Sequence, residues 1–174
     1  MNFNFANFPI LETERIFLRQ LNFDDVDAVF ELRSSEVINK LITRKTPRSK
    51  EEALDFIKVC HQEFKNGNRI FWAIEFEKEL IGTIVFHHIS LKNSYAEIGC
   101  ELNPDYHKKG LMSEAMKAVL EFGFNQIELK TIDAFTHKNN IPSITLLEKH
   151  HFVFQPERRD DGFENNRIFR LEHK

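Results

Sequence analysis

The chain has 174 residues, 41% hydrophobic and 29% charged, and its formal net charge of -3 argues against the broad basic surface that nucleic-acid binding needs. Two cysteines favour a reducing, cytoplasmic setting, and no apolar run approaches the roughly 20 residues of a membrane span. We therefore expect one globular domain over residues 1–174 that binds neither nucleic acid nor a membrane.

The first part of the chain predicts one strand followed by two helices. Residues 15–21 alternate in polarity and predict a strand, and Asn22 follows as a helix cap with acidic residues behind it. Ser49 stands three residues before Glu52, which is the spacing of a capping box, and residues 53–64 place apolar side chains at helical spacing. The second helix is therefore predicted with a defined start.

From residue 70 onward, strand patterns and helix patterns alternate. Strands are predicted at 69–76, 80–88, 95–102 and 131–136, helices from about 110 to 124 and from 140 to 150, and a closing hairpin from 152–158 and 166–172 around Asp161-Gly162. Pro104 ends the third of these strands, and Asn140 is placed to cap the last helix. This order predicts a mixed α/β fold.

The segment DYHKKGLMSEA at 105–115 lies between a predicted strand and a predicted helix. The first amides of a helix have no intrahelical acceptor, and the helix dipole adds positive charge there, so such a turn can bind an anion. Gly110 would let phosphate oxygens approach the backbone closely. Considered alone, one glycine fits an ordinary surface turn better, because neither GxxxxGK[ST] nor GxGxxG is present.

Three segments together resemble the GNAT superfamily of acetyl-CoA-dependent N-acetyltransferases: AEIGCEL at 96–102, HKKGLM at 107–112 and NIPSITLLEKHHF at 140–152. The second is similar to the family's Q/R-x-x-G-x-G/A loop and matches it strictly only at Gly110, since Met112 replaces a small residue. The third resembles N-x-x-S-x-x-x-x-E-K-x-G-F, with His151 in place of the glycine. The SEAM helix start is similar to the branch that acetylates ribosomal-protein N-termini at alanine or serine.

The resemblance implies the acyl-CoA N-acyltransferase fold, a mixed, mostly antiparallel sheet of about seven strands with helices on both faces. It implies acetyl-CoA as cosubstrate, with the loop amides on its pyrophosphate, the strand at 95–102 along its pantetheine, and Ser143 near its sulfur. The implied coenzyme-binding residues are Gly99, Cys100, Leu102, His107, Lys108, Lys109, Gly110, Leu111, Met112, Ser113, Asn140 and Ser143.

Direct acetyl transfer to an amine needs a base for the amine and an acid for the departing thiolate. Strand alternation places Glu97 and Glu101 on one face, with Glu101 the preferred base and a solvated sheet face as the alternative. The family's acidic tyrosine falls at Leu147, so Ser143 becomes the substitute acid, directly or through water, unless it only caps the helix or contacts the coenzyme.

The acceptor is expected to be a primary amine, and the pKa of an amine limits which class of amine can react at neutral pH. At neutral pH, deprotonating a lysine costs about 3.4 kcal/mol more than deprotonating an α-amine, so a weak carboxylate base favours a protein or peptide N-terminus or a small amine. The pocket for it is expected between the segments 41–50 and 160–166. A non-catalytic acyl-CoA-binding or sensing module is the alternative, because the tyrosine is missing. The chain is expected to be a monomer or a homodimer.

Other reactive side chains have plainer interpretations. His87 and His88 are adjacent in a strand and are expected to point to opposite faces, and His150 and His151 lack the HExxH spacing, so no metal is predicted. Cys100 shares a strand face with apolar neighbours and is expected to be a small buried hydrophobe, and Trp72 a core residue.

Overall fold

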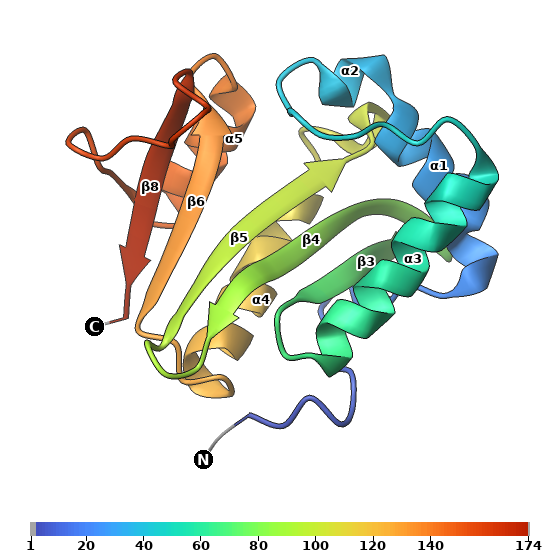
Figure 1. Cartoon of the computed structure of the whole chain (residues 1–174), viewed down its shortest axis with the longest axis horizontal. Helices are drawn as coiled ribbons and strands as arrows, with labels where there is room; N and C mark the ends of the chain where they lie inside the picture. The colour runs from blue at the N-terminus through green and yellow to red at the C-terminus, as the bar shows by residue number, and fades with distance from the viewer. Residues whose placement is uncertain (1–2, 174) are drawn as a thin grey trace.

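The computed structural model describes residues 3–173, which form one twisted eight-stranded sheet flanked by helices (Figure 1). The strands are β1 (Leu11–Glu12), β2 (Ile16–Gln20), β3 (Ile70–Phe76), β4 (Glu79–Ser90), β5 (Tyr95–Leu102), β6 (Thr131–His137), β7 (Val153–Phe154) and β8 (Asn166–Glu172). The helices are α1 (Val26–Ser34), α2 (Glu36–Asn39), α3 (Lys50–Lys65), α4 (Leu111–Asn125) and α5 (Ile141–Lys149), with 3-10 turns η1 (Phe23–Asp25) and η2 (Pro104–Tyr106). None of the helices in residues 3–173 has the length and apolar character to cross a membrane.

The predicted caps start the helices as expected, with one change at α3. The Asn22 side chain accepts from the Asp24 amide at 2.8 Å, and the Asp25 carboxylate accepts from the Asn22 amide at 2.7 Å. Ser49 accepts from the Glu52 amide at 3.3 Å, but the Glu52 carboxylate accepts from the amide of Arg48 instead of closing the box on Ser49. Side-chain oxygens thus replace the partners that the first helical amides lack.

The sheet order is β1-β2-β3-β4-β5-β6-β8-β7, and every neighbouring pair is antiparallel except β5 with β6. The predicted mixed, mostly antiparallel sheet is confirmed, with the short β1 as an addition. The closing hairpin differs from the expectation, because β7 has only two residues and residues 155–165 form a long connection to β8. The turn signal at Asp161-Gly162 marks a bend inside that connection.

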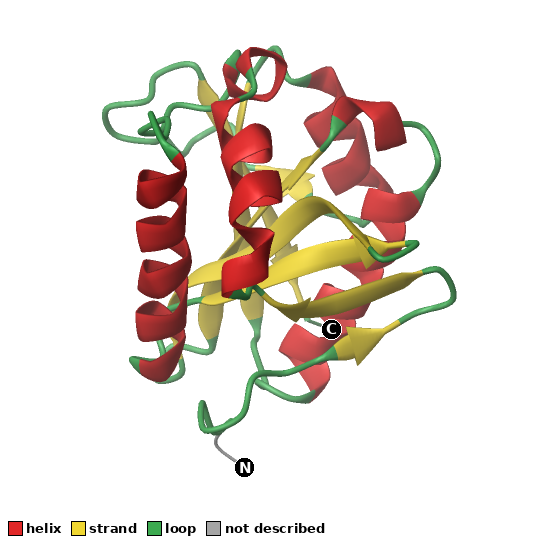
Figure 2. Cartoon of the chain, turned by 90° about the vertical axis from the view of Figure 1, so that its right-hand side faces the viewer, coloured by secondary structure: helices red, strands yellow, loops and turns green. Residues whose placement is uncertain are grey.

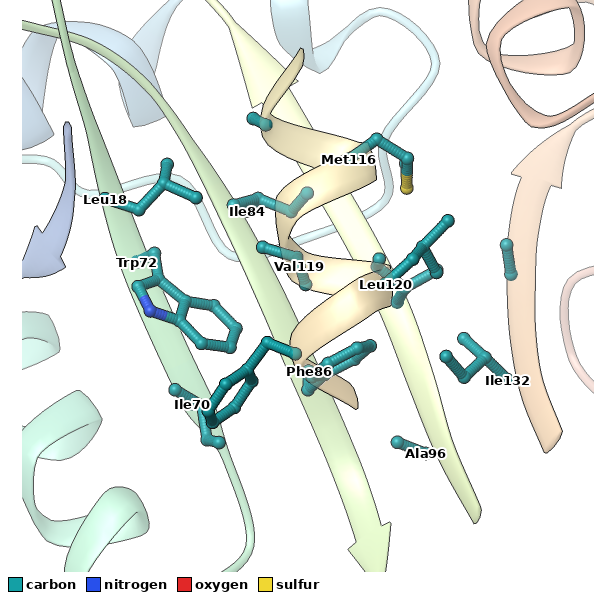
Figure 3. Packing of buried hydrophobic residues seen from close by; sticks show 14 of the residues in the cluster. Leu18, Ile70, Trp72, Ile84, Phe86, Ala96, Met116, Val119, Leu120 and Ile132 are labelled. Carbon is teal, nitrogen blue, oxygen red and sulfur yellow. The ribbon is translucent and has the colours of Figure 1, made fainter. Parts of the chain in front are cut away.

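Helices cover both faces of the sheet, as predicted (Figure 2). Alternate strand residues point to opposite faces. On one face, Phe71 and Ala73 of β3 pack in a cluster with Ala53 and Ile57 of α3. On the other, the buried residues of α4 pack over those of β2 to β6, and this larger cluster surrounds Trp72 (Figure 3). Trp72 is fully buried, which confirms its interpretation as a core residue.

The parallel pair β5 and β6 separates along its length (Figure 1). The two strands pair from Tyr95 with Thr131 to Ile98 with Ala134, and no pairing follows beyond that point. On its other side, β5 remains paired with β4 as far as Leu102. Residues 99–102 therefore have a strand neighbour on one side only, so the backbone groups that residues 99–101 direct toward β6 have no strand partner there.

Candidate active site

A cavity of about 560 Å³ occupies the space where β5 and β6 diverge. Its walls come from residues 97–101 of β5, residues 134–137 of β6, and Asn140 and Ser143 at the start of α5. The far wall comes from residues 41–44, which connect α2 to α3. The cavity therefore lies at the end of the parallel strand pair, where open α/β sheets commonly bind ligands.

The glycine turn leads from β5 into α4, and the lining of the cavity does not include its residues 107–113. Gly110 is the N-cap of α4, with a left-handed φ of 76°, and Lys108 has a φ of 60°. The Leu111 side chain is buried, so only its amide can serve a ligand, and the Lys109 ammonium lies 5.0 Å from the ring centre of Tyr106. The amides at the helix start are therefore better placed than the lysines as anion donors.

Two further contacts tie the residues of this turn to their surroundings. The imidazole of His107 contacts the carbonyl oxygen of Leu102 through Nε2 at 3.0 Å, which fastens the turn to the end of β5. Ser113 Oγ in α4 lies 2.9 Å from Nε2 of His150, the C-cap residue of α5. Burial lowers the pKa of His150, so its neutral ring can exchange a hydrogen bond with the Ser113 hydroxyl. Met112 is half-buried and packs against the core.

A brace beneath the turn has no counterpart among the sequence predictions. Arg15 donates from Nη1 to the carbonyl of Lys109 at 2.9 Å and from Nε to Glu114 at 2.7 Å. The same carboxylate accepts from the Thr13 hydroxyl at 2.6 Å. Burial would raise the pKa of Glu114, but the hydrogen bonds from Thr13 and Arg15 outweigh it and lower the pKa. Glu114 of the SEAM segment therefore holds the turn to the connection between β1 and β2.

Replacing Gly110 by aspartate is expected to weaken acetyl-CoA binding by about tenfold or more, because a carboxylate would stand where the helix start favours an anion. A Cβ at this position would also lie 3.3 Å from Arg15 Nη2, so the new carboxylate would compete with Lys109 for the brace. Calorimetric titration with acetyl-CoA measures the affinity. Gly162→Asp is the matched control, because Gly162 has a similar φ of 83° and a Cβ there would meet no atom within 4 Å. Equal affinity in both variants would remove the anion site.

Glu101 and Glu97 both line the cavity, as their predicted shared face requires. Glu101 is 8% exposed, and its carboxylate forms an ion pair with Arg44, lies 3.8 Å from Arg33 and accepts from the Thr83 hydroxyl at 3.3 Å. The alternative of a solvated sheet face is therefore wrong for Glu101. The sequence alone does not predict that Arg33 and Arg44 pair with Glu101, because both arginines are far from β5 along the chain.

Asn140 and Ser143 lie together at the start of α5. The Asn140 side chain accepts from the Ser143 amide at 3.3 Å, and the half-buried Ser143 lines the cavity. Leu147, at the family's tyrosine position, is buried. The two tyrosines of the chain bond elsewhere: Tyr95 to Glu97 and Asp133, and Tyr106 to Glu79. Within residues 3–173, therefore, no phenol replaces the missing acid.

The structure also shows how Cys100 and the adjacent His87 and His88 lie in β5 and β4. Burial raises the pKa of the Cys100 thiol to about 12, and its side chain packs against the core. The residue is only half-buried and also lines the cavity, so the expected full burial is not met. The expectation that His87 and His88 point to opposite faces is wrong. β4 has a register shift between His87 and Ser90, and His88 takes a left-handed φ of 49°. Both imidazoles consequently turn toward Glu97.

The two segments expected to form the acceptor pocket meet at the cavity. Residues 41–44 come from the connection between α2 and α3, and Asp160, Phe163 and Asn166 come from the connection into β8. These segments are far apart in the sequence, and they line one continuous space with the ends of β5 and β6. The loops and the strand ends therefore line one shared cavity.

Comparison with known proteins identifies this architecture. The family model for the acetyltransferase (GNAT) domain matches residues 15–153. The uncharacterized N-acetyltransferase YoaA of Bacillus subtilis is 34% identical over 160 residues, which cover 91% of this chain and 90% of that protein. A GNAT-family acetyltransferase structure from Bacillus anthracis is 27% identical, with a TM-score of 0.76 over 94% of this chain and 98% of the other.

A solved structure also shows a coenzyme bound to this fold. RimL, described as a ribosomal L7/L12 α-N-protein acetyltransferase in complex with coenzyme A, has a TM-score of 0.81 at 18% identity, and the match covers 94% of this chain and 98% of RimL. The family match spans most of the chain, from β2 to β7. The chain belongs to the GNAT family of acetyltransferases and is an acetyl-CoA-dependent N-acetyltransferase.

Proposed function

We propose that this enzyme transfers the acetyl group of acetyl-CoA directly to the α-amine of a peptide or protein N-terminus, or to a small amine of similar pKa. The observation that carries the proposal is the end of the β5–β6 pairing at Ile98 and Ala134 beside the cavity. Backbone groups of residues 99–101 without a strand partner can bond the pantetheine amides and the acetyl carbonyl, and the amides around Gly110 can hold the pyrophosphate.

The proposed reaction moves two protons: one passes from the amine to a base, and one passes from an acid to the thiolate. The neutral amine nitrogen attacks the thioester carbonyl, the carbon–sulfur bond breaks, and the amine loses a proton while the thiolate gains one. Glu101, or Glu97 as the second candidate, accepts the amine proton through water. Ser143 is at the start of α5 and lines the cavity, and it relays a proton from water to the thiolate, so that its own hydroxyl is restored. Backbone donors of β5 stabilise the oxyanion between these steps.

The acceptor class follows from proton cost and from the relatives. A carboxylate is a weak base, so it serves an α-amine better than a lysine, which has less than about one hundredth as much neutral amine at neutral pH. RimL is described as acting on the α-amine of ribosomal L7/L12, which supports an N-terminal acceptor for this chain. The cavity also opens between residues 41–44 and the loop at 160–166, which gives a peptide a route of entry.

A matched pair of peptides tests the acceptor. We expect a peptide with a free N-terminus and no lysine to be acetylated at least about tenfold faster at pH 7 than the same peptide with a blocked N-terminus and one lysine. Release of coenzyme A thiol gives the rates, and mass spectrometry locates the acetyl group. A doubly blocked peptide is the control, and a set of small amines forms the third arm.

The outcomes separate the alternatives. Product on the lysine side chain alone would contradict the proposed acceptor. Turnover of small amines only would restrict the acceptor to small amines and exclude peptide N-termini. Tight acetyl-CoA binding with no thiol release from any acceptor would contradict direct transfer and favour the coenzyme-binding module. Since the lysine needs a higher pH to become neutral, the difference between the two peptides should shrink as the pH rises from 7 to 9.

A further inference from the structure

Three potential metal ligands converge at the edge of the acceptor cavity. Nδ1 of His87 lies 3.6 Å from Oε2 of Glu97, and Nδ1 of His88 lies 3.0 Å from the same oxygen. One ligand atom from each of the three residues lies within 4.8 Å of the others. The two rings are neighbours, with centroids 4.8 Å apart, so both imidazoles flank one carboxylate.

The backbone creates this convergence. His87 is the direct partner of Glu97 across the β4–β5 pair, so their side chains share a face. In a regular strand His88 would point to the opposite face, toward the core. The register shift before Ser90 inserts an extra residue into β4, and the left-handed φ of 49° at His88 returns its imidazole to the side of Glu97.

We propose that His87, His88 and Glu97 form a binding site for a divalent transition-metal ion such as Zn²⁺, with the fourth coordination position open to the cavity. Around a tetrahedral Zn²⁺ with bonds of about 2.0–2.2 Å, ligand atoms lie about 3.3–3.5 Å apart. The two separations of 3.0 and 3.6 Å between the histidines and Glu97 bracket that value, and the two imidazole ligand atoms lie within 4.8 Å of each other, so an ion must draw the two rings together. Two imidazoles and one carboxylate form a donor set that Zn²⁺ commonly accepts.

The surroundings prepare the ligands. Tyr95 donates its hydroxyl to Oε1 of Glu97 at 3.2 Å, which leaves Oε2 facing the histidines and orients the carboxylate. His88 is 71% exposed, which gives an ion a path from solvent.

The site has a consequence for the enzyme that rests on the proposed function. His87, His88 and Glu97 all line the cavity that holds the proposed acceptor path, and Glu97 is the second candidate base. A bound Zn²⁺ would occupy Glu97 and add positive charge where a cationic amine must enter. Zn²⁺ is therefore an inhibitor that competes with the amine acceptor and not with acetyl-CoA.

Metal binding can be measured without any acetyl transfer. Zn²⁺ is titrated into the metal-free protein in competition with a chromophoric chelator, and Co²⁺ is titrated separately to detect the visible absorption of tetrahedral coordination. We expect one ion per chain in the site. His88→Asn and Glu97→Gln should each weaken Zn²⁺ affinity by at least about tenfold, since even the loss of an outer-shell partner costs about 10–100-fold.

His151→Asn is the matched control. His151 is also exposed and also has a left-handed backbone, with φ 66°, so the same substitution is made at the same conformation outside the cluster. Asparagine tolerates that conformation, so both variants should fold. Equal Zn²⁺ affinity in the wild type and all three variants, or loss in His151→Asn alone, would overturn the site. Because these readouts need no acceptor, a failure of the proposed function would leave them unchanged.

Discussion

Asp133→Ala is expected to lower the free energy of unfolding by about 3 kcal/mol, because it leaves two arginines beside a buried gap with no counter-charge. Asp133 is fully buried on β6 and forms ion pairs at 2.8 Å with Arg158 and with Arg170. The Tyr95 hydroxyl oxygen also lies 3.2 Å from Oδ2 of Asp133, and the one hydroxyl proton is shared between Asp133 and Glu97. The loss should lie at the low end of the range for buried pairs, since the arginine side chains are 31% and 30% exposed and can recover some water.

The effect should depend on pH in a defined direction. Burial alone would raise the pKa of Asp133, but the hydrogen bonds from Arg170 and Arg158 outweigh it and lower the pKa below its ordinary value of 3.8. A lowered folded-state pKa contributes stability above the unfolded pKa, and that contribution is lost as the pH falls through the folded pKa. The difference between wild type and Asp133→Ala should therefore be largest at neutral pH and shrink toward pH 3.

Urea unfolding at pH 7 and pH 3 measures both quantities. Asp161→Ala, which removes an exposed aspartate from the connection into β8, is the control and should change stability little. A loss no greater than that of the control at pH 7 would show that Asp133 does not fasten β6 to its neighbours. The position matters for function, because Asp133 lies opposite Glu97 in the last paired stretch before β5 and β6 separate.

The features that the sequence predicts well are local. The α3 helix follows from apolar residues at helical spacing behind Ser49, and α5 follows from Asn140 and Pro142, because caps and periodicity act within a few residues. The order of elements then carried the family resemblance, which the family match confirms. The long connection between β7 and β8 was not predictable in the same way, because apolar residues on both sides of Asp161-Gly162 resemble the arms of a hairpin.

The contacts that shape the candidate site are distant in sequence. Arg15 and Glu114 are 99 residues apart, and Arg44 and Glu101 are 57 residues apart, so no periodic pattern relates them. The bulge that turns His88 toward Glu97 depends on the register between β4 and β5, which alternation alone does not define. The residue types were visible in the sequence, but their partners depend on how the strands and loops pack.

Glu101→Gln is expected to lower kcat/KM for the amine by about 100-fold or more at pH 7, which is the usual range for loss of a general base. Glutamine keeps the size of the side chain, and its one carbonyl oxygen can accept from Arg44 while its amide group donates to the Thr83 hydroxyl. Acetyl-CoA affinity should therefore change little, although removal of the counter-charge to Arg44 should lower the free energy of unfolding. The loss should diminish as the pH rises, because an acceptor that is already neutral needs no base. Steady-state rates from pH 6 to 9, with acetyl-CoA affinity measured by calorimetry, give both quantities.

The ion pair with Arg44 makes a second role for Glu101 testable, since the carboxylate could instead hold Arg44 and the wall formed by residues 41–44 in place. In that case Arg44→Ala should reduce kcat/KM as much as Glu101→Gln, mainly through KM, and the reduction should persist at high pH. A base at Glu101 predicts a different result: Arg44→Ala retains a pH-dependent kcat, while Glu101→Gln loses it. Glu97→Gln is the third variant. If it lowers kcat/KM more than Glu101→Gln does, the base is Glu97, the carboxylate beside His87 and His88.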